Sequence, residues 1–291
     1  MMDINSQTKL YCLIGNPVNK SLSPTIHNYL FDKEKENAVY MAFNIEKEDL
    51  KSVVNSFRAI NVKGFNVTIP YKIDIINFVD ELSYESELIG AVNTVKICNG
   101  KLIGYNTDGL GFLKAFKEKN ISLKGKNVLI LGAGGAAQSI SLTVANEGVK
   151  SLTILNRTVS KSRELIEKIK NKFPKIETNY GGLNEKYVDL KKIDVLINCT
   201  SIGMYPEVDK TPIEINGFNK NIIVYDIIYK PLETKLIKSA KEKGMITIGG
   251  LDMLIYQALL SDEIWLDRKL EIEKMKNEIK KRILSENIEV I

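Results

Sequence analysis

The chain has 291 residues, of which 44% are hydrophobic, and its 41 Lys and Arg residues exceed its 36 Asp and Glu residues by only 5. This length accommodates two domains with a buried core each. The mild surplus of positive charge is spread along the sequence, which argues against a nucleic-acid-binding protein. A signal-peptide pattern and an apolar run long enough to span a bilayer are both absent from the sequence, so we expect a cytoplasmic protein that does not bind membranes.

Strand and helix patterns alternate through the first third of the chain. The apolar patterns predict strands over Leu10–Gly15, Val39–Ile45 and Gly64–Ile69, and helices from about Pro24, over Lys47–Arg58 and after Tyr71. Two further strands, Ala91–Cys98 and Lys101–Tyr105, are joined by Asn99-Gly100, a dipeptide typical of tight hairpin turns. These elements predict a first α/β domain.

An apolar run that leads into glycines begins the second domain. Val128-Leu-Ile-Leu-Gly132-Ala-Gly134-Gly135-Ala136-Ala137 predicts a buried strand over Asn127–Leu131 and a helix over Ala136–Asn146. Gly132 permits a tight turn, Gly134 lets the backbone approach a pyrophosphate, and the small Ala137 lets helix and strand pack closely. The first turn of the helix directs its N–H groups at the phosphates. This pattern predicts a Rossmann-type dinucleotide site.

The tip of the next predicted strand, Ser151–Leu155, favours NADP over NAD. NAD-selective proteins place an acidic residue there for the ribose 2′-hydroxyl, whereas this chain has Asn156-Arg157-Thr158, with Ser160 and Lys161 close behind. Arg157 can direct two hydrogen bonds at a phosphate group. We therefore predict NADP(H) as the cofactor.

The remaining patterns complete the second domain and the C-terminal part. We predict strands over Asp194–Thr200 and Asn221–Tyr229, a helix over Leu251–Leu260, and a solvent-facing charged helix within Asp267–Arg282. The predicted domains are 1–106 with 250–291, and 107–249. The distant cysteines Cys12, Cys98 and Cys199 are predicted to be reduced core residues. His and Cys are too few and scattered to predict a metal site.

Small polar residues gather where strands of the first domain are predicted to end. They are Ser21, Ser23, Asn66, Thr68, Lys72, Asn93, Thr94, Asn106, Thr107 and Asp108. Taken singly, some of them could be helix caps, Ser23 before Pro24 above all. Together they suit a polyhydroxylated ligand, which such side chains bind without burying net charge.

Motifs spread over nearly the whole chain resemble those of the shikimate dehydrogenase family. They are Gly15-Asn-Pro17, Ser21-Leu-Ser-Pro24, His27-Asn28, Asn66-Val-Thr-Ile-Pro-Tyr-Lys72, Gly90-Ala-Val-Asn-Thr94, Asn106-Thr-Asp-Gly109, Gly132-Ala-Gly-Gly-Ala136, Asn156-Arg-Thr158, Asn198-Cys-Thr-Ser-Ile-Gly-Met204, Asp226-Ile-Ile-Tyr229 and Gly249-Gly-Leu-Asp-Met253 with Gln257. The resemblance implies a two-domain α/β enzyme, with an N-terminal substrate domain, a Rossmann-type NADP domain and a cleft between them. It implies NADPH-dependent, reversible reduction of 3-dehydroshikimate to shikimate, a step in making the aromatic amino acids.

The resemblance also implies roles for individual residues. Lys72 and Asp108 would be the catalytic pair, and the substrate would be bound by Ser21, Ser23, Asn66, Thr68, Lys72, Asn93, Asp108, Tyr229 and Gln257. The cofactor would be bound by Gly132, Ala133, Gly134, Gly135, Ala136, Asn156, Arg157, Thr158, Lys161, Thr200, Ile227, Gly250 and Met253. The only histidine, His27, is predicted to be structural.

Several alternatives stay open at the level of sequence. Negative charge develops on the carbonyl oxygen during hydride transfer, and Lys72 could either deliver the proton or stabilise the alkoxide electrostatically. A quinate/shikimate dehydrogenase with broader substrate or NAD use is one rival, and Arg157 argues against a preference for NAD. A dinucleotide sensor without catalytic activity is the other, and the Lys72 and Asp108 pair disfavours it. The protein could be a monomer or a homodimer.

Overall fold

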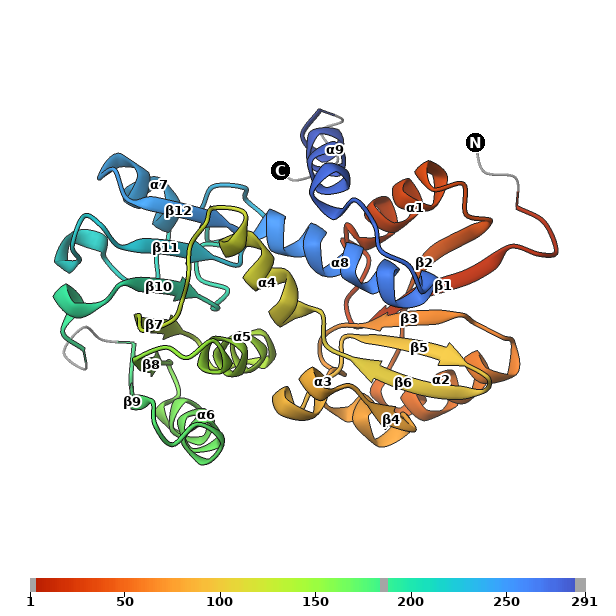
Figure 1. Cartoon of the computed structure of the whole chain (residues 1–291), viewed down its shortest axis with the longest axis horizontal. Helices are drawn as coiled ribbons and strands as arrows, with labels where there is room; N and C mark the ends of the chain where they lie inside the picture. The colour runs from red at the N-terminus through yellow and green to blue at the C-terminus, as the bar shows by residue number, and fades with distance from the viewer. Residues whose placement is uncertain (1–3, 184–187, 286–291) are drawn as a thin grey trace. The chain divides into compact units, whose positions relative to one another are not determined.

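The computed structural model describes residues 4–183 and 188–285. Residues 1–3 and 286–291 of the predicted domain 1–106 with 250–291 therefore lie outside the described residues, as do residues 184–187 of the predicted domain 107–249. The chain forms two compact units. Unit 1 comprises residues up to Gly111 together with Ile255–Lys281, and unit 2 comprises Phe112–Leu254 together with the described residues from Arg282 on. Helices α4 and α8 each contribute residues to both units (Figure 1).

Unit 1 contains a mixed sheet in the order β2-β1-β3-β5-β6-β4. Its strands are β1 (Lys9–Gly15), β2 (Ala38–Asn44), β3 (Gly64–Val67), β4 (Glu81–Leu82), β5 (Thr94–Cys98) and β6 (Lys101–Tyr105). Its helices are α1 (Ser23–Lys33), α2 (Leu50–Ala59), α3 (Tyr84–Ile89) and parts of α4 (Asp108–Lys117), α8 (Gly250–Leu266) and α9 (Ile272–Ser285). Strand β1 pairs in parallel with β2 and β3, whereas β3, β5 and β6 pair antiparallel.

Unit 2 contains a parallel sheet in the order β12-β11-β10-β7-β8-β9. Its strands are β7 (Asn127–Leu131), β8 (Ser151–Leu155), β9 (Glu177–Gly181), β10 (Val195–Asn198), β11 (Ile223–Asp226) and β12 (Ile246–Gly249). Helices α5 (Gly135–Asn146), α6 (Val159–Lys172) and α7 (Lys235–Glu242) connect them. This is the doubly wound strand order, which binds ligands at the carboxyl ends of its strands where the order reverses, here between β7 and β10. The predicted α/β fold class is confirmed.

Several local predictions agree closely with the structure. Strands β7 and β8 have the predicted bounds, because buried parallel strands read as continuous apolar runs. At the hairpin between β5 and β6, Asn99 and Gly100 both have positive φ angles of 51° and 76°, as a type I′ turn requires.

Other local predictions are wrong. The segment after Tyr71 forms only a short 3-10 helix, Asp74–Phe78, because the chain becomes extended at Val79 on its way into β4. Ser23 is not the N-cap of α1. Leu22 takes that place, and Ser23 begins the helix directly before Pro24.

Strands β5, β10 and β11 are shorter than predicted. Ala91–Asn93 lie outside the β5 ladder, and the backbone N–H groups of Val92 and Asn93 donate to carbonyls of Lys72 and Tyr105. Strands β10 and β11 end at Asn198 and Asp226. Each of these two side chains accepts a hydrogen bond from a backbone N–H of the loop that follows it, and this ends the strands.

The C-terminal helix and one cysteine also differ from the predictions. Helix α9 was expected to face solvent, yet it buries Ile272, Met275, Ile279 and Ile283, whose spacing forms one apolar face. Cys98 is exposed because it lies at the tip of the β5–β6 hairpin, whereas Cys12 is buried and Cys199 is partly buried.

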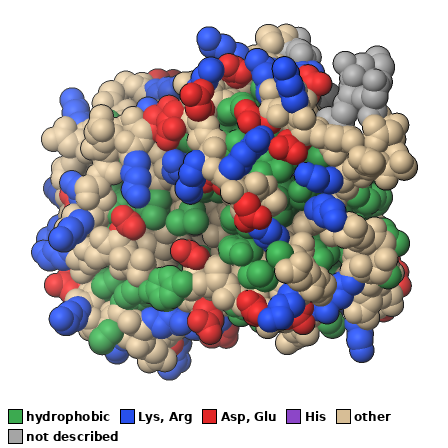
Figure 2. Space-filling model, turned by 45° about the vertical axis from the view of Figure 1, so that its right-hand side comes forward, with side chains coloured by type: hydrophobic (Ala, Val, Ile, Leu, Met, Phe, Trp, Pro, Cys, Tyr) green, Lys and Arg blue, Asp and Glu red, His purple; other side chains and the backbone are tan. Residues whose placement is uncertain are grey.

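The surface carries mixed charge. Lys and Arg side chains alternate with Asp and Glu side chains on the face shown in Figure 2, in keeping with the small net charge. None of the helices in the described part of the chain combines the length and the apolar character that crossing a membrane requires.

Candidate active site

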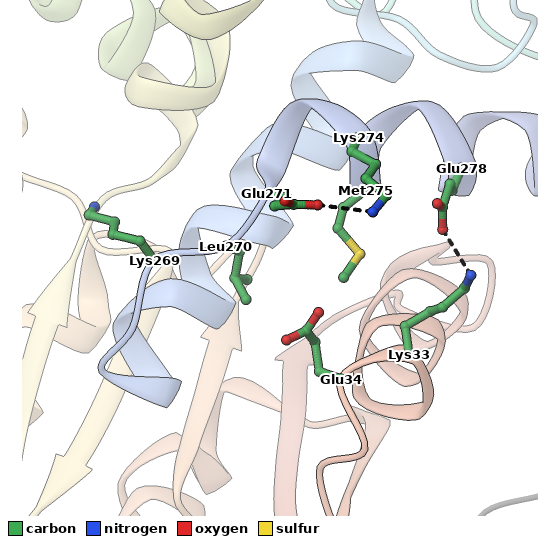
Figure 3. Close-up of a pocket in the computed structure, with 8 residues that line it drawn as sticks. All are labelled: Lys33, Glu34, Lys269, Leu270, Glu271, Lys274, Met275 and Glu278. Carbon is green, nitrogen blue, oxygen red and sulfur yellow. Dashed lines mark hydrogen bonds and ion pairs between the residues drawn. The ribbon is translucent and has the colours of Figure 1, made fainter.

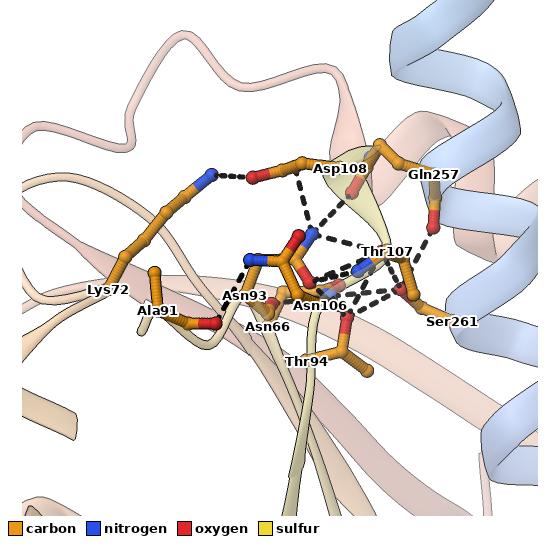
Figure 4. Close-up of polar contacts among 10 residues, drawn as sticks. All are labelled: Asn66, Lys72, Ala91, Asn93, Thr94, Asn106, Thr107, Asp108, Gln257 and Ser261. Atoms are coloured by element: carbon orange, nitrogen blue, oxygen red, sulfur yellow. Dashed lines mark hydrogen bonds and ion pairs between the residues drawn. The ribbon is translucent and has the colours of Figure 1, made fainter. Parts of the chain in front are cut away.

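A contact between Lys72 and Asp108 forms the exposed end of a polar network in unit 1. The Lys72 ammonium donates to Asp108 Oδ2 at 2.5 Å (Figure 4). Lys72 lies in the loop after β3, and Asp108 is the first residue of α4. Their side chains are 18% and 9% exposed, so the ion pair is shielded from bulk water on most sides while a ligand can still reach it.

Asn93 holds Asp108 from the other side. Its Nδ2 group lies 2.9 Å from Asp108 Oδ1, 2.9 Å from Thr107 Oγ1 and 3.3 Å from Gln257 Oε1. Its Oδ1 accepts from the Thr107 N–H at 2.8 Å. Asn93 is therefore fixed by Thr107 before α4, by Asp108 at the start of α4 and by Gln257 on α8, and it orients the carboxylate that Lys72 contacts.

Ser261 and Asn66 extend the network into the core of unit 1. Ser261 lies one helical turn after Gln257 on α8, and its hydroxyl contacts Thr94 Oγ1 at 2.8 Å and Thr107 Oγ1 at 3.2 Å. Asn66 Nδ2 donates to Thr94 Oγ1 at 3.0 Å and to Ser261 Oγ at 3.2 Å. Because each of these side chains is hydrogen-bonded to others in the network, the network holds its polar groups in fixed orientations.

Tyr40 holds the Asn66 side chain in place from the core of unit 1. Its hydroxyl donates to Asn66 Oδ1 at 2.7 Å, and its ring stacks on His27 at a centroid distance of 4.1 Å. His27 Nδ1 lies 2.8 Å from Asp262 Oδ1, and both side chains are fully buried. Burial raises the pKa of Asp262, while His27 lowers it. His27 thus lies in the core behind the network.

The structure joins five of the predicted substrate residues of unit 1 in the network, and Ser23 lies within hydrogen-bonding reach of the Tyr40 hydroxyl behind it. Asn66, Lys72, Asn93, Asp108 and Gln257 belong to the network. Ser21 and Ser23 hydrogen-bond to each other at 3.1 Å, and Thr68 packs its methyl group beside Gly15. Ser261 and Tyr40 were missed. The four-residue spacing from Gln257 to Ser261 could have indicated the serine, whereas Tyr40 lies in an apolar strand that gives no such signal.

The glycine-rich turn of unit 2 has the shape that a pyrophosphate needs. Gly132 has φ +106°, and a Cβ there would lie 2.9 Å from the Cys199 carbonyl oxygen. A Cβ at Gly134 or Gly135 would meet open space. Helix α5 begins after Gly134 without a side-chain cap and without an acidic residue in its first turn, so its N–H groups are available to an anion.

The other predicted cofactor residues of unit 2 lie along the same edge of the sheet. Asn156 Nδ2 donates to the Thr158 carbonyl at 2.9 Å, and this fixes the turn after β8. Arg157, Thr158 and Lys161 are exposed. Leu131 and Leu155, the last residues of β7 and β8, line a hollow with Pro212 and Ile213.

Two more loops of unit 2 carry predicted residues. Thr200 lies beside Gly132. A Cβ added to Gly132 would be 3.3 Å from the methyl group of Thr200. Gly250 lies so close to the Ile227 carbonyl that a Cβ would stand 2.0 Å from the oxygen. Met253 is buried on α8, and burial raises the pKa of Tyr229. These residues fit a dinucleotide that extends along the carboxyl ends of the strands.

Another hollow lies in unit 1, and its lining lacks a polar network like that around Lys72 and Asp108. It lies between α1 and α9 (Figure 3), where Lys33 pairs with Glu278 at 3.1 Å and Lys274 with Glu271 at 3.0 Å. Its charges compensate one another. Among residues 4–183 and 188–285, no three His, Cys, Asp or Glu side chains gather as metal ligands.

Comparison with known proteins identifies the family. Residues 13–95 match the shikimate dehydrogenase substrate binding domain, and residues 114–227 match the shikimate / quinate 5-dehydrogenase domain. A shikimate dehydrogenase (NADP(+)) of Methanococcus aeolicus is 49% identical over 95% of this chain and 98% of its own length. This chain belongs to the shikimate dehydrogenase family. The resemblance that the motifs predicted is confirmed.

Solved structures of shikimate dehydrogenases have the same fold. A crystal structure of a shikimate dehydrogenase in complex with NADP+ is 44% identical, covers 97% of this chain and 98% of its own, and superposes with a TM-score of 0.90. The enzyme from Listeria monocytogenes, solved with shikimate and NAD, is 36% identical, covers 95% and 98% of the two chains, and has a TM-score of 0.88.

Proposed function

We propose that this protein catalyses the NADPH-dependent, reversible reduction of 3-dehydroshikimate to shikimate. The observation that carries the proposal is the contact between Lys72 and Asp108 within a hydrogen-bonded polar network, in a member of the shikimate dehydrogenase family. A non-catalytic sensor would have no use for a charged pair of this kind. Unit 1 is the proposed substrate domain and unit 2 the proposed NADP domain.

Lys72 and Asp108 are the proposed catalytic residues. As the ketone is reduced, negative charge develops on its oxygen, and the Lys72 ammonium can donate a hydrogen bond or a proton to it. The Asp108 carboxylate holds that ammonium in place through Oδ2. Each carboxylate oxygen has a second lone pair, so Asp108 can also accept from a substrate hydroxyl. Asn93 keeps the carboxylate in one orientation.

The remaining substrate contacts are proposed for the polar side chains around this pair. Asn66, Asn93 and Gln257 present amides, which suit ring hydroxyls because each amide both donates and accepts. Ser21 and Ser23 are a pair of adjacent hydroxyls that suit a carboxylate. Thr68 and Tyr229 stay predictions as substrate ligands.

The proposed NADP site lies in unit 2. Gly132 to Ala136 would hold the pyrophosphate, and Asn156, Arg157, Thr158 and Lys161 the 2′-phosphate; Thr200, Ile227, Gly250 and Met253 would lie along the nicotinamide half. When bound, NADPH supplies the hydride. The open space at Gly134 and the uncapped start of α5 support this assignment. A cytoplasmic location and the choice between monomer and homodimer also stay predictions.

One experiment separates this function from its two rivals. Formation of the reduced cofactor, NADPH or NADH, is followed by absorbance with purified protein, using shikimate or quinate as substrate and NADP+ or NAD+ as cofactor. We expect shikimate with NADP+ to give the highest kcat/KM. A higher kcat/KM for quinate with NAD+ would replace the proposal by a quinate/shikimate dehydrogenase. Absence of turnover together with NADPH binding would favour the sensor.

A further inference from the structure

Asp226 is a fully buried carboxylate at the end of β11. Its Oδ1 accepts from Asn198 Nδ2 at 3.0 Å and from the Ile228 N–H at 3.1 Å, and its Oδ2 accepts from the Thr234 hydroxyl at 2.7 Å. The three donors come from the end of β10, the loop after β11 and the start of α7. One carboxylate therefore holds three separate parts of unit 2.

Asn198 passes this constraint on to the loop after β10. It is the direct neighbour of Asp226 in the register of the two strands, and it is also fully buried. Its Oδ1 accepts from the Thr200 N–H at 3.0 Å and from the Thr200 hydroxyl at 2.7 Å. Because Asn198 Nδ2 donates to Asp226, the amide can have only one orientation. Thr200 is therefore fixed through Asn198.

Both loops that Asp226 joins carry proposed cofactor residues. Thr200 lies beside Gly132 of the glycine-rich turn, and the Ile227 carbonyl lies against Gly250. Asp226 itself is 0% exposed, so it lies behind these residues rather than against a ligand. Its influence on a cofactor would act through the position of the loops.

The carboxylate is a costly choice for this position. Burial raises the pKa of Asp226 to about 6, although the hydroxyl of Thr234, the N–H of Ile228 and the amide of Asn198 each lower it. An asparagine would avoid the cost of burying a charge, yet it has a single acceptor oxygen and could not serve donors on both sides. The need for two acceptor oxygens explains why an acid stands here.

We propose that Asp226 is a positioning residue for the cofactor, which ties the loop after β10 to the loop after β11 and so holds Thr200 and Ile227 in place for NADP(H). This inference rests on the proposed function of unit 2. Under this inference Asp226 contributes to cofactor affinity although it contacts neither the substrate nor the cofactor.

The test measures NADPH binding to purified protein without substrate, by titration of NADPH fluorescence. Asp226→Asn should raise the Kd for NADPH about tenfold, because at least one buried bond to a charged acceptor is lost. The KM for shikimate at saturating NADP+ should stay at the wild-type value. Asp194→Asn is the matched control. That carboxylate accepts from the N–H and the side chain of Asn127 at the opposite end of the same sheet, and its loss should leave the Kd unchanged.

Thr234 supplies a second variant in case Asp226→Asn fails to fold. Thr234→Val removes one donor to Asp226 and should raise the Kd in the same direction, whereas Thr234→Ser keeps the hydroxyl and should restore it. A wild-type Kd in Asp226→Asn or in Thr234→Val, or an equal rise in Asp194→Asn, overturns the positioning role. Failure of the wild-type protein to bind NADPH would instead overturn the proposed function.

Discussion

Lys72 Nζ lies 2.5 Å from Asp108 Oδ2, although 36 positions separate the two residues in the chain. Each follows the end of a strand: Lys72 lies in the loop after β3, and Asp108 begins α4 directly after the turn that follows β6. The strand order β3-β5-β6 places these connections close together. The proposed chemistry therefore depends on sheet topology as much as on the identity of the two side chains.

Lys72→Met should lower kcat about 100- to 10,000-fold, because a positioned proton donor contributes a factor of this size. The Kd for NADPH should stay within twofold, roughly the scatter of such measurements. Lys96→Met is the matched control, since Lys96 pairs with Asp267 outside the network. Steady-state kinetics and NADPH titration measure both quantities. Full turnover by Lys72→Met would refute the proposed role.

Gly132→Ala and Gly134→Ala should fail in different ways. At Gly132, the positive φ and the close Cys199 carbonyl make a methyl group strained, so we expect a loss of about 2 kcal/mol in the free energy of unfolding. At Gly134, where φ is −89° and a Cβ meets open space, stability should be unchanged. The methyl group would instead occupy pyrophosphate space, and the Kd for NADPH should rise about tenfold or more. Thermal unfolding and NADPH titration separate the two, and unaltered NADPH affinity in Gly134→Ala would argue against the site.

Arg157→Ala should raise the KM for NADPH roughly 10- to 100-fold, the worth of a forked, charge-assisted contact to a phosphate. The KM for NADH should change little, because NADH has no 2′-phosphate. Arg163→Ala, on the exposed surface of α6 in the same unit, is the control. If NADPH and NADH are affected equally by Arg157→Ala, the guanidinium does not read the 2′-phosphate.

Tyr40→Phe should raise the KM for shikimate severalfold, because Asn66 Oδ1 loses the donor that holds it in place. The free energy of unfolding should fall by about 1 kcal/mol, typical for one buried hydrogen bond. Tyr71→Phe removes an equally buried hydroxyl that donates to the Ile45 carbonyl instead. It should cost similar stability and leave the KM for shikimate unchanged. If the KM for shikimate is the same in both variants, the Tyr40 hydroxyl does not hold Asn66 in place for the substrate.

Asp226 should make stability depend on pH in an unusual direction. Its pKa is about 6 in the folded protein and 3.8 ordinarily, so between about pH 4 and about pH 6 the folded state binds more protons than the unfolded state. The free energy of unfolding therefore falls as pH rises through this window, by about 3 kcal/mol at about 1.4 kcal/mol per unit. In Asp226→Asn this component is absent.

Urea unfolding of both proteins across that window checks the sign. The wild type should gain stability relative to Asp226→Asn as pH is lowered from about 6 to about 4, while the contributions of other carboxylates cancel in the difference. Asp226 raises the pKa of the neighbouring Cys199 thiol, which titrates far above this range. A difference that is constant with pH would contradict the buried-charge account.

Local features were predicted well where one short segment contains the whole cause. The bounds of β7 and β8 follow from uninterrupted apolar runs, and the positive φ of Gly132 follows from the turn that the glycine motif requires. The apolar neighbours of Cys98 predict burial, yet the thiol is exposed because the hairpin turn follows it directly. The charged residues that dominate the composition of α9 predict exposure, and they obscure its apolar face.

By itself, the sequence determined the α/β class, the glycine-rich turn, the strand tip around Arg157 and the set of polar residues from which a site is built, because each depends on residues that are neighbours in the chain. Only the tertiary structure decided that Lys72 meets Asp108, that Ser261 and Tyr40 support the network, and that Asp226 joins two loops. Those contacts bridge distant segments, and their distances follow from strand order and register, which no single segment encodes.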